Sequence, residues 1–318
     1  TAGERIAMAL LAMAIRDEGV EAMSLTGSQA GILTDTSHGH AKIRDIKAFR
    51  VVEGLEAGKV VIVAGFQGVS PDTKEITTLG RGGSDATAVA MAAALGADVC
   101  EIYTDVDGVF TADPRVVPDA RKLDEVSFDE MLELAGSGAR VLMPRSVEFG
   151  KRFNVPIHVR SSFHDRPGTW VKEKVMEQAI ISGVVHDVSE AKITVRGVPD
   201  TPGVAAAVFG PLAEAGISVD MIVQNVSSGG AADISFTIPR ELLPQATPIA
   251  HRVAGEIGAS GVDVDGTIGR VSIVGSGMRA YPAVAARMFS VLAAAGINIA
   301  MISTSPIRVS CVIAESAV

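Results

Sequence analysis

The first half of the chain alternates between segments with helical spacing of apolar residues and short runs that are continuously apolar. The helical spacing predicts helices over residues 4–18, 85–95, 127–135 and 140–147. Ser127 and Glu130, three residues apart, predict a capping box at the start of the third helix. The short apolar runs predict buried strands over residues 60–64, 99–104 and 155–159. Strands that alternate with helices indicate a mainly parallel sheet that is covered by helices on both faces.

The second half of the chain contains an internal repeat. Residues 202–222 align with residues 282–302, and about a dozen of the 21 aligned positions are identical. The identical pairs include Phe209/Phe289, Leu212/Leu292, Gly216/Gly296, Ile217/Ile297 and Met221/Met301. A strand-like run precedes each copy, at 192–196 and at 270–274. We interpret the repeat as a small βαβ-type module used twice, because a shift of this length is typical of a duplicated domain rather than of a solenoid.

Composition supports a folded chain with more than one domain. The 318 residues are about twice the usual domain length. Hydrophobic residues make up 47% and charged residues 20%, which favours packed cores over disorder. The formal net charge of −9 argues against a general nucleic-acid-binding surface. Cys100 and Cys311 are too few for a disulfide framework, so we expect a reducing cytoplasm.

No segment of the sequence predicts a membrane span or a secretion signal. The Ala-rich stretch 86–100 is too short to cross a bilayer and is interrupted by Gly96 and Asp98. The apolar run 7–15 resembles the core of a secretion signal, but charged residues follow it directly and no small-residue cleavage site is present. We interpret that run as a packed amphipathic helix.

The glycine-rich string at 80–85, directly before the predicted Ala-rich helix, is the first candidate for chemistry. Gly80, Gly82 and Gly83 allow backbone N–H groups to approach an anion closely, and the helix N-terminus adds the positive end of its dipole. Arg81 supplies a guanidinium that matches a carboxylate or a phosphate. A structural turn capped by Ser84 or Asp85 is the alternative, but it does not explain an arginine between glycines.

The second candidate is the string 103–115, which follows a predicted strand. Ligands of open α/β sheets bind beyond the carboxyl ends of the strands, so Asp105, Asp107 and Asp113 could serve a nucleotide or a metal. The run lacks the distant Glu of a calcium loop, which argues against a calcium site. A plain acidic loop remains the alternative.

Three further features carry less weight. Glu4 lies at the start of a predicted helix, where a carboxylate is favourable whatever its function. The string 275–280 matches a dinucleotide fingerprint, but no acidic residue follows at the required distance. His38 and His40 have no further ligands at zinc spacing, so we expect exposed loop histidines and no metal site held by the protein. No phosphate-binding string of the Gly-x-x-x-x-Gly-Lys type is present.

Taken together, these motifs resemble aspartate kinase, and the resemblance runs nearly end to end. The matching strings cover residues 1–6, 26–31, 64–68, 77–85, 103–115 and 158–162, and the segments 224–227 and 298–305 resemble the paired ACT domains of that family. Several amino-acid kinases share the Gly-Arg-Gly-Gly-Ser-Asp string. The tandem repeat narrows the resemblance to the bacterial type that lysine and threonine regulate.

The resemblance implies a fold and its boundaries. We expect an α/β, three-layer αβα amino-acid-kinase domain over residues 1–165 and a connector over 166–179. Two ferredoxin-like (βαββαβ) ACT domains then follow over 180–262 and 263–318, the second incomplete at its C-terminus. The family also has a strand and a lysine-containing phosphate loop before the position of Thr1. We therefore expect the printed chain by itself to have little or no activity.

The resemblance also implies an activity, namely transfer of the γ-phosphoryl group of ATP, with Mg²⁺, to the β-carboxylate of L-aspartate. This reaction gives 4-phospho-L-aspartate and opens the biosynthesis of lysine, threonine, methionine and diaminopimelate. Carried over by position, Glu4 holds the substrate ammonium, and Arg81 grips a carboxylate beside Gly82 and Ser84. Asp85 orients the phosphate-binding lysine, so Arg81 and Asp85 are the expected catalytic residues. Such chemistry depends on positioning and charge neutralisation rather than on a nucleophilic side chain.

The expected nucleotide site consists of residues that follow one strand, together with one later arginine. Its members are Tyr103, Thr104, Val109, Phe110, Thr111, Ala112, Asp113, Pro114, Arg115 and Arg140. Arg115 is expected near the phosphates. Arg140 stands where the family usually has a nucleotide-contacting lysine, so the charge is retained with a different geometry.

The expected effector site binds L-threonine, L-lysine or both, at the turns before the repeated helices and on the strands that follow. Its members are Asp200, Gly203, Val204, Ala205, Ser218, Val219, Asp220, Gln224, Asn298, Ile299 and Ser305. Turns before helices offer N–H groups to a carboxylate, and Asp200 or Asp220 can pair with an ammonium. We expect a homo-oligomer, or an α2β2 assembly with a separately started regulatory subunit, formed through the ACT domains.

Two alternatives stay open. A non-catalytic amino-acid-binding regulatory subunit would need the repeats but neither Arg81 nor the string 103–115. Another amino-acid kinase, acting on glutamate, acetylglutamate or a nucleoside monophosphate, would not need the two ACT-like copies.

Overall fold

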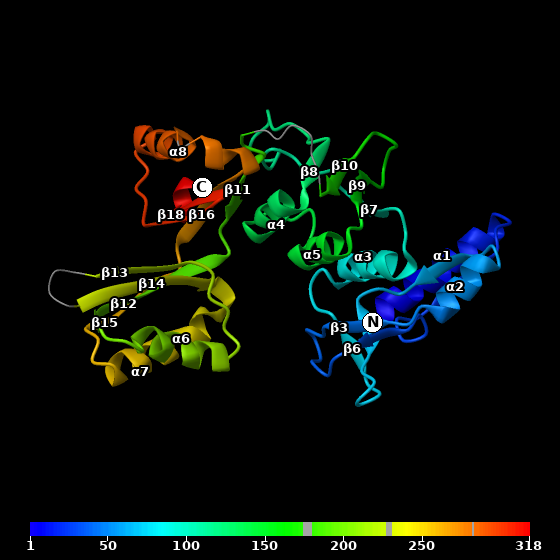
Figure 1. The fold of residues 1–318 in the computed structure, drawn as a ribbon, viewed down its shortest axis with the longest axis horizontal. Helices are drawn as coiled ribbons and strands as arrows, with labels where there is room; N and C mark the ends of the chain where they lie inside the picture. The colour runs from blue at the N-terminus through cyan, green and yellow to red at the C-terminus, as the bar shows by residue number, and fades with distance from the viewer. Residues whose placement is uncertain (174–179, 227–230, 282) are drawn as a thin grey trace. The chain divides into compact units, whose positions relative to one another are not determined.

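The computed structural model describes residues 1–173, 180–226, 231–281 and 283–318. The chain folds into two compact units, Thr1–Glu177 and Gln178–Val318, and each is described by itself (Figure 1). Residues 174–179 of the expected connector, Ser227 and Pro282, with which the second repeat begins, lie outside the described residues. Within the described part, no helix combines the length and apolar character that a bilayer crossing needs.

Among residues 1–173 of the first unit, five helices pack around short strands (Figure 1). The helices are α1 (Ala2–Asp17), α2 (Phe49–Glu56), α3 (Gly83–Leu95), α4 (Phe128–Gly136) and α5 (Pro144–Phe153). The strands are β1 (Ala22–Leu25), β2 (Ile32–Thr34), β3 (Ile43–Ile46), β4 (Val60–Val63), β5 (Gln67–Val69), β6 (Ile76–Thr78), β7 (Cys100–Thr104), β8 (Glu125–Ser127), β9 (Ile157–Ser161) and β10 (Thr169–Lys172). The α/β class expected from the sequence is confirmed.

The strands of the first unit form three sheets, with the orders β1-β4, β3-β2-β5-β6 and β7-β9-β10-β8. The pairs β1–β4, β2–β5, β7–β9 and β8–β10 are parallel, as helical crossovers require, and the remaining pairs are antiparallel. The expectation of a fully buried strand at 60–64 is wrong, because Val60 is 40% exposed. Its strand β4 has β1 as its only pairing partner among the described strands, so its other edge stays open.

Local signals set the ends of two helices. Ser127 accepts a hydrogen bond from the Glu130 N–H, and Glu130 accepts one from the Ser127 N–H, so the predicted capping box at the start of α4 is confirmed. The helix predicted over 140–147 instead begins at Pro144, since proline fits the first helical turn, where its missing N–H has no intrahelical partner. It continues to Phe153 and ends at Asn154, which is left-handed (φ 53°).

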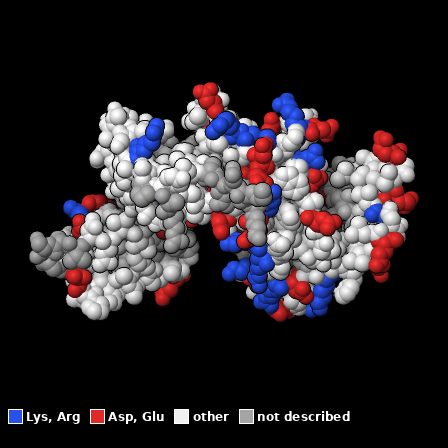
Figure 2. Space-filling view, turned by 45° about the horizontal axis from the view of Figure 1, so that its top comes forward, with Lys and Arg blue, Asp and Glu red and all other residues white. Residues whose placement is uncertain are grey.

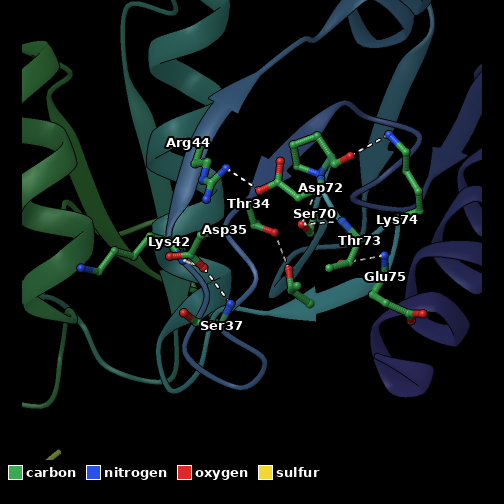
Figure 3. Close-up of polar contacts among 12 residues, drawn as sticks. Thr34, Asp35, Ser37, Lys42, Arg44, Ser70, Asp72, Thr73, Lys74 and Glu75 are labelled. Atoms are coloured by element: carbon green, nitrogen blue, oxygen red, sulfur yellow. Dashed lines mark hydrogen bonds and ion pairs between the residues drawn. The ribbon is translucent and has the colours of Figure 1, made fainter. Parts of the chain in front are cut away.

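Polar contacts fix the sheet β3-β2-β5-β6 (Figure 3). The hydroxyl groups of Thr34 and Thr77 lie 2.6 Å apart in a fully buried hydrogen bond. The Asp35 carboxylate accepts hydrogen bonds from the backbone N–H groups of Ser37 and Lys42, both at 3.1 Å. The loop between β2 and β3 therefore has a defined shape where it approaches the glycine-rich turn before α3.

The second unit contains two modules of similar design. The first contains β12 (Glu190–Pro199), α6 (Val204–Glu214), β13 (Ile222–Val226), β14 (Ala231–Pro239), η1 (Arg240–Leu242), α7 (Leu243–Glu256) and β15 (Gly261–Asp265). The second contains β16 (Ile268–Val274), η2 (Ser276–Ala280), α8 (Ala283–Ala294), β17 (Met301–Ser305), β18 (Arg308–Ala314) and η3 (Glu315–Ala317). A further strand, β11 (Gly183–Asp187), precedes both. Both modules share a strand, a helix and two further strands, β12-α6-β13-β14 and β16-α8-β17-β18, which is one strand more than the βαβ unit predicted from the sequence.

The two modules have the same sheet topology. The first sheet has the order β13-β14-β12-β15, and helices α6 and α7 cover one of its faces (Figure 1). The second sheet has the order β11-β16-β18-β17, and α8 packs on it through Met288 and Leu292. These are the ferredoxin-like ACT folds that the resemblance implied.

Strand β11 joins the sheet of the second module, although it precedes the first module in the chain. It pairs antiparallel with β16 from Gly183↔Val274 to Asp187↔Arg270. The chain thus contributes one strand to the sheet of the second module before it forms the strands of the first module's sheet. In the first unit, β10 lies inside the segment expected as a connector, where Trp170 pairs with His158 on β9 and with Glu125 on β8.

Candidate functional site

The glycine-rich turn before α3 requires glycine at two positions. Gly80 and Gly82 have left-handed backbones, with φ of 80° and 69°. A β-carbon at position 82 would overlap the side chain of Met143, and one at position 80 would lie 2.9 Å from the Gly39 carbonyl oxygen. Only glycine allows the chain to turn this sharply against both neighbours.

The predicted anion-binding residues surround the N-terminus of α3. The side chains of Arg81 and Ser84 are exposed, whereas Gly82 and Asp85 are half-buried. Burial raises the pKa of Asp85, and a hydrogen bond from the Met143 backbone acts in the opposite direction. An arginine, a hydroxyl group and the first N–H groups of a helix thus lie together, which is an arrangement suited to a carboxylate or a phosphate.

Phe66 lies beside this turn in an unusual conformation. Its φ of 67° is uncommon for a residue with a bulky side chain. The Phe66 N–H donates to the Thr87 hydroxyl at 3.2 Å, and the Phe66 carbonyl oxygen accepts from the Leu79 N–H at 3.0 Å. Strained residues of this kind persist only where their surroundings hold them, and they are frequent at functional sites.

Arg145 on α5 supports the same turn from the other side. Its guanidinium donates to the Leu79 carbonyl oxygen at 3.2 Å and to the Ala41 carbonyl oxygen at 2.9 Å. Burial lowers the pKa of Arg145. Because these bonds join the residue after β6 to the loop between β2 and β3, Arg145 fixes the position of the turn that carries Arg81.

The N-terminal turn of α1 is attached to the strand that follows Phe66. Glu4 is half-buried there, and the Nε–H of its neighbour Arg5 donates to Gln67 Oε1 at 3.2 Å. Gln67 is only 1% exposed. The structure therefore connects the turns of Glu4 and Arg81 through one segment, residues 64–68.

The expected nucleotide loop is ordered by contacts with later segments. Val109 is buried, and its N–H donates to the Thr169 hydroxyl at 2.9 Å. The Arg115 guanidinium pairs with Asp113 at 2.8 Å, although the Arg115 side chain remains 83% exposed. Phe110, Thr111 and Ala112 are half-buried, and Pro114 is exposed. The loop can therefore offer backbone groups and one arginine to a nucleotide, whereas the Val109 side chain belongs to the interior.

Tyr103 and Thr104 lie at the carboxyl end of β7. The Tyr103 hydroxyl donates to Glu101 at 3.0 Å, and the Arg160 guanidinium lies 5.6 Å from the centre of the Tyr103 ring. The hydrogen bond to Glu101 raises the pKa of Tyr103, and the contact with Arg160 lowers the pKa of Glu101. Tyr103 is 55% exposed, so its ring remains accessible.

Arg140, in the segment before α5, is exposed, and so are His38 and His40. Across residues 1–173 and the described part of the second unit, no three His, Cys, Asp or Glu side chains are grouped as metal ligands would be. In Figure 2, Lys and Arg side chains gather on the lower part of the first unit, although the net charge of the chain is −9. Such a local excess of positive charge attracts anions.

The predicted effector residues occupy the turns of the second unit. Gly203 is left-handed (φ 96°) and caps α6, which begins with Val204 and Ala205. Asp200, Gln224 and Asn298 are exposed, whereas Ile299 and Ser305 are half-buried. Ser218, Val219 and Asp220 connect α6 to β13. Asn298 and Ile299 lie between α8 and β17, where Ser218 and Val219 lie between α6 and β13, whereas Gln224 lies within β13 and Ser305 ends β17.

Asp220 already has a partner in the structure. Its carboxylate contacts the guanidinium of Arg270, a residue on β16 that is 1% exposed. Arg270 also lies 3.0 Å from Glu190 and 3.8 Å from Asp187. One buried guanidinium thus faces three carboxylates. Glu190 and Asp220 belong to the first module, and Asp187 lies on β11 in the sheet of the second. Any ammonium that binds Asp220 has to share it with Arg270.

The comparisons with known proteins agree with this architecture. A model of the amino acid kinase family matches residues 1–161, and two ACT domain models match residues 193–255 and 271–318. The aspartokinase of Mycolicibacterium smegmatis is 58% identical over 322 residues, which cover 99% of this chain and 76% of that protein. The chain belongs to the aspartokinase family.

Other aspartokinases support this assignment. The aspartate kinase of Pseudomonas fluorescens is 55% identical and the aspartokinase of Corynebacterium glutamicum 53% identical, each with 76% of its length covered. Crystal structures of E. coli aspartokinase III cover 99% of this chain and 71% of their own. The complex with aspartate and ADP has a TM-score of 0.84 at 28% identity, and the complex with lysine and aspartate has 0.75 at 29%.

Sequence analysis did not identify several residues whose long-range contacts order the two units of this aspartokinase. Phe66 and Gln67 lie in a string that resembled the family, but nothing in that string revealed the positive φ or the burial. Arg145, Thr87 and Arg270 carried no local signal, because the contacts that join them to other segments span 21 to 104 residues of sequence.

Proposed function

We propose that this aspartokinase transfers the γ-phosphoryl group of ATP to the β-carboxylate of L-aspartate. A bond forms between the γ-phosphorus and a β-carboxylate oxygen, the bond to the oxygen that bridges the β- and γ-phosphates breaks, and ADP leaves with that electron pair. The products are 4-phospho-L-aspartate and ADP. Membership of the family supports this proposal, and so does the likeness to the crystal structure of E. coli aspartokinase III in complex with aspartate and ADP.

The turn at 80–85 is the observation on which the assignment of the acceptor site depends. In our proposal Arg81 pairs with a carboxylate of aspartate, while Gly82 and Ser84 supply an N–H group and a hydroxyl group beside it. Glu4 takes the ammonium group. Arg81 and Glu4 thus offer opposite charges that match the carboxylate and the ammonium group of an amino acid.

The nucleotide occupies the loop 103–115 in this proposal, with Tyr103, Thr104 and the backbone of 109–114 along it and Arg115 near the phosphates. The Arg115 guanidinium donates two hydrogen bonds to Asp113, at 3.0 and 2.8 Å, and in this proposal it exchanges them for bonds to a phosphate group. Mg²⁺ arrives with ATP and neutralises charge on its phosphates when bound. Magnesium bound mainly by phosphates and water needs few protein carboxylates, which fits the described residues.

We further propose that L-threonine, L-lysine or both inhibit this enzyme by binding the second unit near the turns that begin with Asp200 and Ser218 and near their counterparts at Asn298. Ammonium and carboxylate groups of an amino acid match the acidic side chains and the helix N-termini of those turns. The enzyme would act in the cytoplasm as an oligomer formed through the ACT domains, and its product would supply lysine, threonine, methionine and diaminopimelate biosynthesis.

The test is an assay of the full-length protein with ATP, Mg²⁺ and L-aspartate, in which hydroxylamine traps the acyl phosphate as a hydroxamate. We expect hydroxamate and ADP in equal amounts with L-aspartate, and much less of both with L-glutamate. Calorimetry with threonine and lysine, singly and together, tests the effector proposal separately. ADP release without hydroxamate, or equal rates with L-glutamate, would contradict the proposed reaction.

A further inference from the structure

Thr87 forms two hydrogen bonds that join separate parts of the first unit. It lies on the second turn of α3 and is 4% exposed. Its hydroxyl group donates to the Gly83 carbonyl oxygen at 2.6 Å and accepts from the Phe66 N–H at 3.2 Å. A hydroxyl group that donates and accepts in this way fixes the distance between the two backbone segments.

The Phe66 segment needs such a restraint. The left-handed conformation of Phe66 costs free energy relative to an extended backbone. Two hydrogen bonds oppose this cost, one from the Leu79 N–H and one to the Thr87 hydroxyl. The second bond depends on a side chain and can therefore be removed by substitution without a change in the backbone.

Both segments that Thr87 joins border the proposed aspartate site. Gly83 lies between Gly82 and Ser84, two of the proposed aspartate ligands. Gly65, which precedes Phe66, approaches Ser84 so closely that a β-carbon on Gly65 would lie 3.3 Å from the Ser84 α-carbon. A small shift of the Phe66 segment would therefore move the first turn of α3 or open a gap beside it.

We infer that Thr87 is a positioning residue for aspartate binding, which holds the Phe66 segment against the first turn of α3 and so sets the geometry of Arg81, Gly82 and Ser84. Thr87 itself does not touch the substrate. This role rests on the proposed function, because it requires that aspartate is the ligand of that turn. The expected consequence is specific to aspartate, since the nucleotide loop is held by other bonds, such as the one from the Val109 N–H to Thr169.

Thr87→Val removes the hydroxyl group at nearly constant shape and leaves the Phe66 N–H without its acceptor. We expect the KM for aspartate to rise about tenfold, as the loss of one partner of a half-buried hydrogen bond implies. The KM for ATP should change less than about twofold. Thr87→Ser keeps the hydroxyl group and should restore most of the aspartate KM. Calorimetric titration with aspartate should give the same order of affinities.

Thr34→Val is the matched control. Thr34 is fully buried in the same unit and shares a 2.6 Å hydrogen bond with Thr77, so its loss also removes one buried hydroxyl contact (Figure 3). We expect Thr34→Val to lower the unfolding temperature as much as Thr87→Val does, with an unchanged KM for aspartate. If Thr87→Val does not fold, Thr87→Ala is compared with Thr87→Ser in the same assays.

Each result bears on the inference in one direction. A selective rise in the aspartate KM for Thr87→Val, rescued by Thr87→Ser, supports it. An unchanged aspartate KM, an equal rise for ATP and aspartate, or an equal effect in Thr34→Val overturns it. Failure of the proposed function is separate and visible beforehand, because the unsubstituted protein would then form no aspartyl phosphate and bind no aspartate.

Discussion

Two arginines lie at the glycine-rich turn, and their surroundings give them different tasks. Arg145 is half-buried and donates to the carbonyl groups of Leu79 and Ala41, so its charge is used within the protein. The Arg81 side chain is exposed and, among the described residues, has no ion-pair partner. An exposed arginine held between two left-handed glycines has a fixed backbone and a free guanidinium, which is the combination a carboxylate ligand needs.

Arg81→Gln should therefore affect aspartate binding and little else. We expect kcat/KM for aspartate to fall by about 100-fold, which corresponds to the loss of one charge-assisted pair of about 2.7 kcal/mol. The unfolding temperature should remain within about 1 °C of the unsubstituted protein, because exposed side chains contribute little to stability. Steady-state kinetics and thermal unfolding measure the two effects.

Arg50→Gln is the control for that substitution, since Arg50 is exposed on α2 of the same unit. It removes the same charge away from the turn and should leave kcat/KM for aspartate unchanged. Equal losses in Arg81→Gln and Arg50→Gln would show that the charge acts at long range and that Arg81 does not bind the substrate.

At the scale of elements, α3 begins and ends at glycines with nearly the same conformation but different surroundings. Gly82 has a φ of 69° and Gly96 a φ of 63°. A β-carbon at Gly82 would overlap Met143, whereas a β-carbon at Gly96 would meet nothing within 4 Å. Alanine substitutions at the two positions therefore distinguish the free-energy cost of a left-handed alanine backbone from the additional cost of a steric overlap.

Gly96→Ala should destabilise the protein by about 1 kcal/mol, the ordinary cost of a left-handed alanine. Gly82→Ala should cost about 2–4 kcal/mol, because overlap with Met143 adds to the same backbone cost. It should also weaken aspartate binding, since relief of the overlap moves Arg81. Urea unfolding and aspartate titration of both variants measure these differences. Equal destabilisation by the two substitutions would show that the Met143 side chain can move aside without a cost in free energy.

At the scale of the whole molecule, the two ACT modules of the second unit are joined by charges as well as by apolar contacts. Met221 of the first module packs with Ile268, Met301 and Val312 of the second. Arg240 on η1 pairs with Glu315 at 3.0 Å, which links the same two modules. The cluster around Arg270 lies between them, so its protonation is coupled to their association.

Glu190 should make the stability of the second unit depend on pH. Burial raises its pKa to about 7, against the opposing effect of Arg270, and the charges of Asp220 and Asp187 add to the rise. The unfolded chain releases this proton near pH 4.5, whereas the folded chain retains it until about pH 7. The stabilising contribution of protonated Glu190 is therefore complete below about pH 4.5 and is lost as the pH rises to about 7.

Glu190→Gln should remove this pH dependence, so that the stability of the variant relative to the unsubstituted protein increases between pH 5 and pH 7. Circular dichroism during urea unfolding measures the effect. Fluorescence of Trp170, the only tryptophan, follows the first unit and should be unaffected. Glu241→Gln, an exposed change on η1, serves as the control. Parallel pH profiles of Glu190→Gln and the unsubstituted protein would contradict the assignment.

Features with a local cause could be predicted from the sequence. The capping box of Ser127 and Glu130 needs only residues three apart, and the helix α3 needs only its Ala-rich run and flanking glycines. The duplicated module could be recognised because its two copies, residues 202–222 and 282–302, share identical residues at many aligned positions. The prediction of an anion site at 80–85 rests on a local cause of the same kind, because a glycine-rich turn before a helix has the same physical properties in any fold.

The sequence by itself thus determined the family, the order of most helices but of fewer than half of the described strands, and the residue types at the turn that carries Arg81. The tertiary structure alone decided which distant segments meet. It placed β11 in the second module's sheet, gave Asp220 a buried partner in Arg270, and brought Phe66 to Thr87. Periodicity and capping record interactions over a few residues, whereas these contacts depend on packing between segments 20 or more residues apart, which leaves no regular trace along the chain.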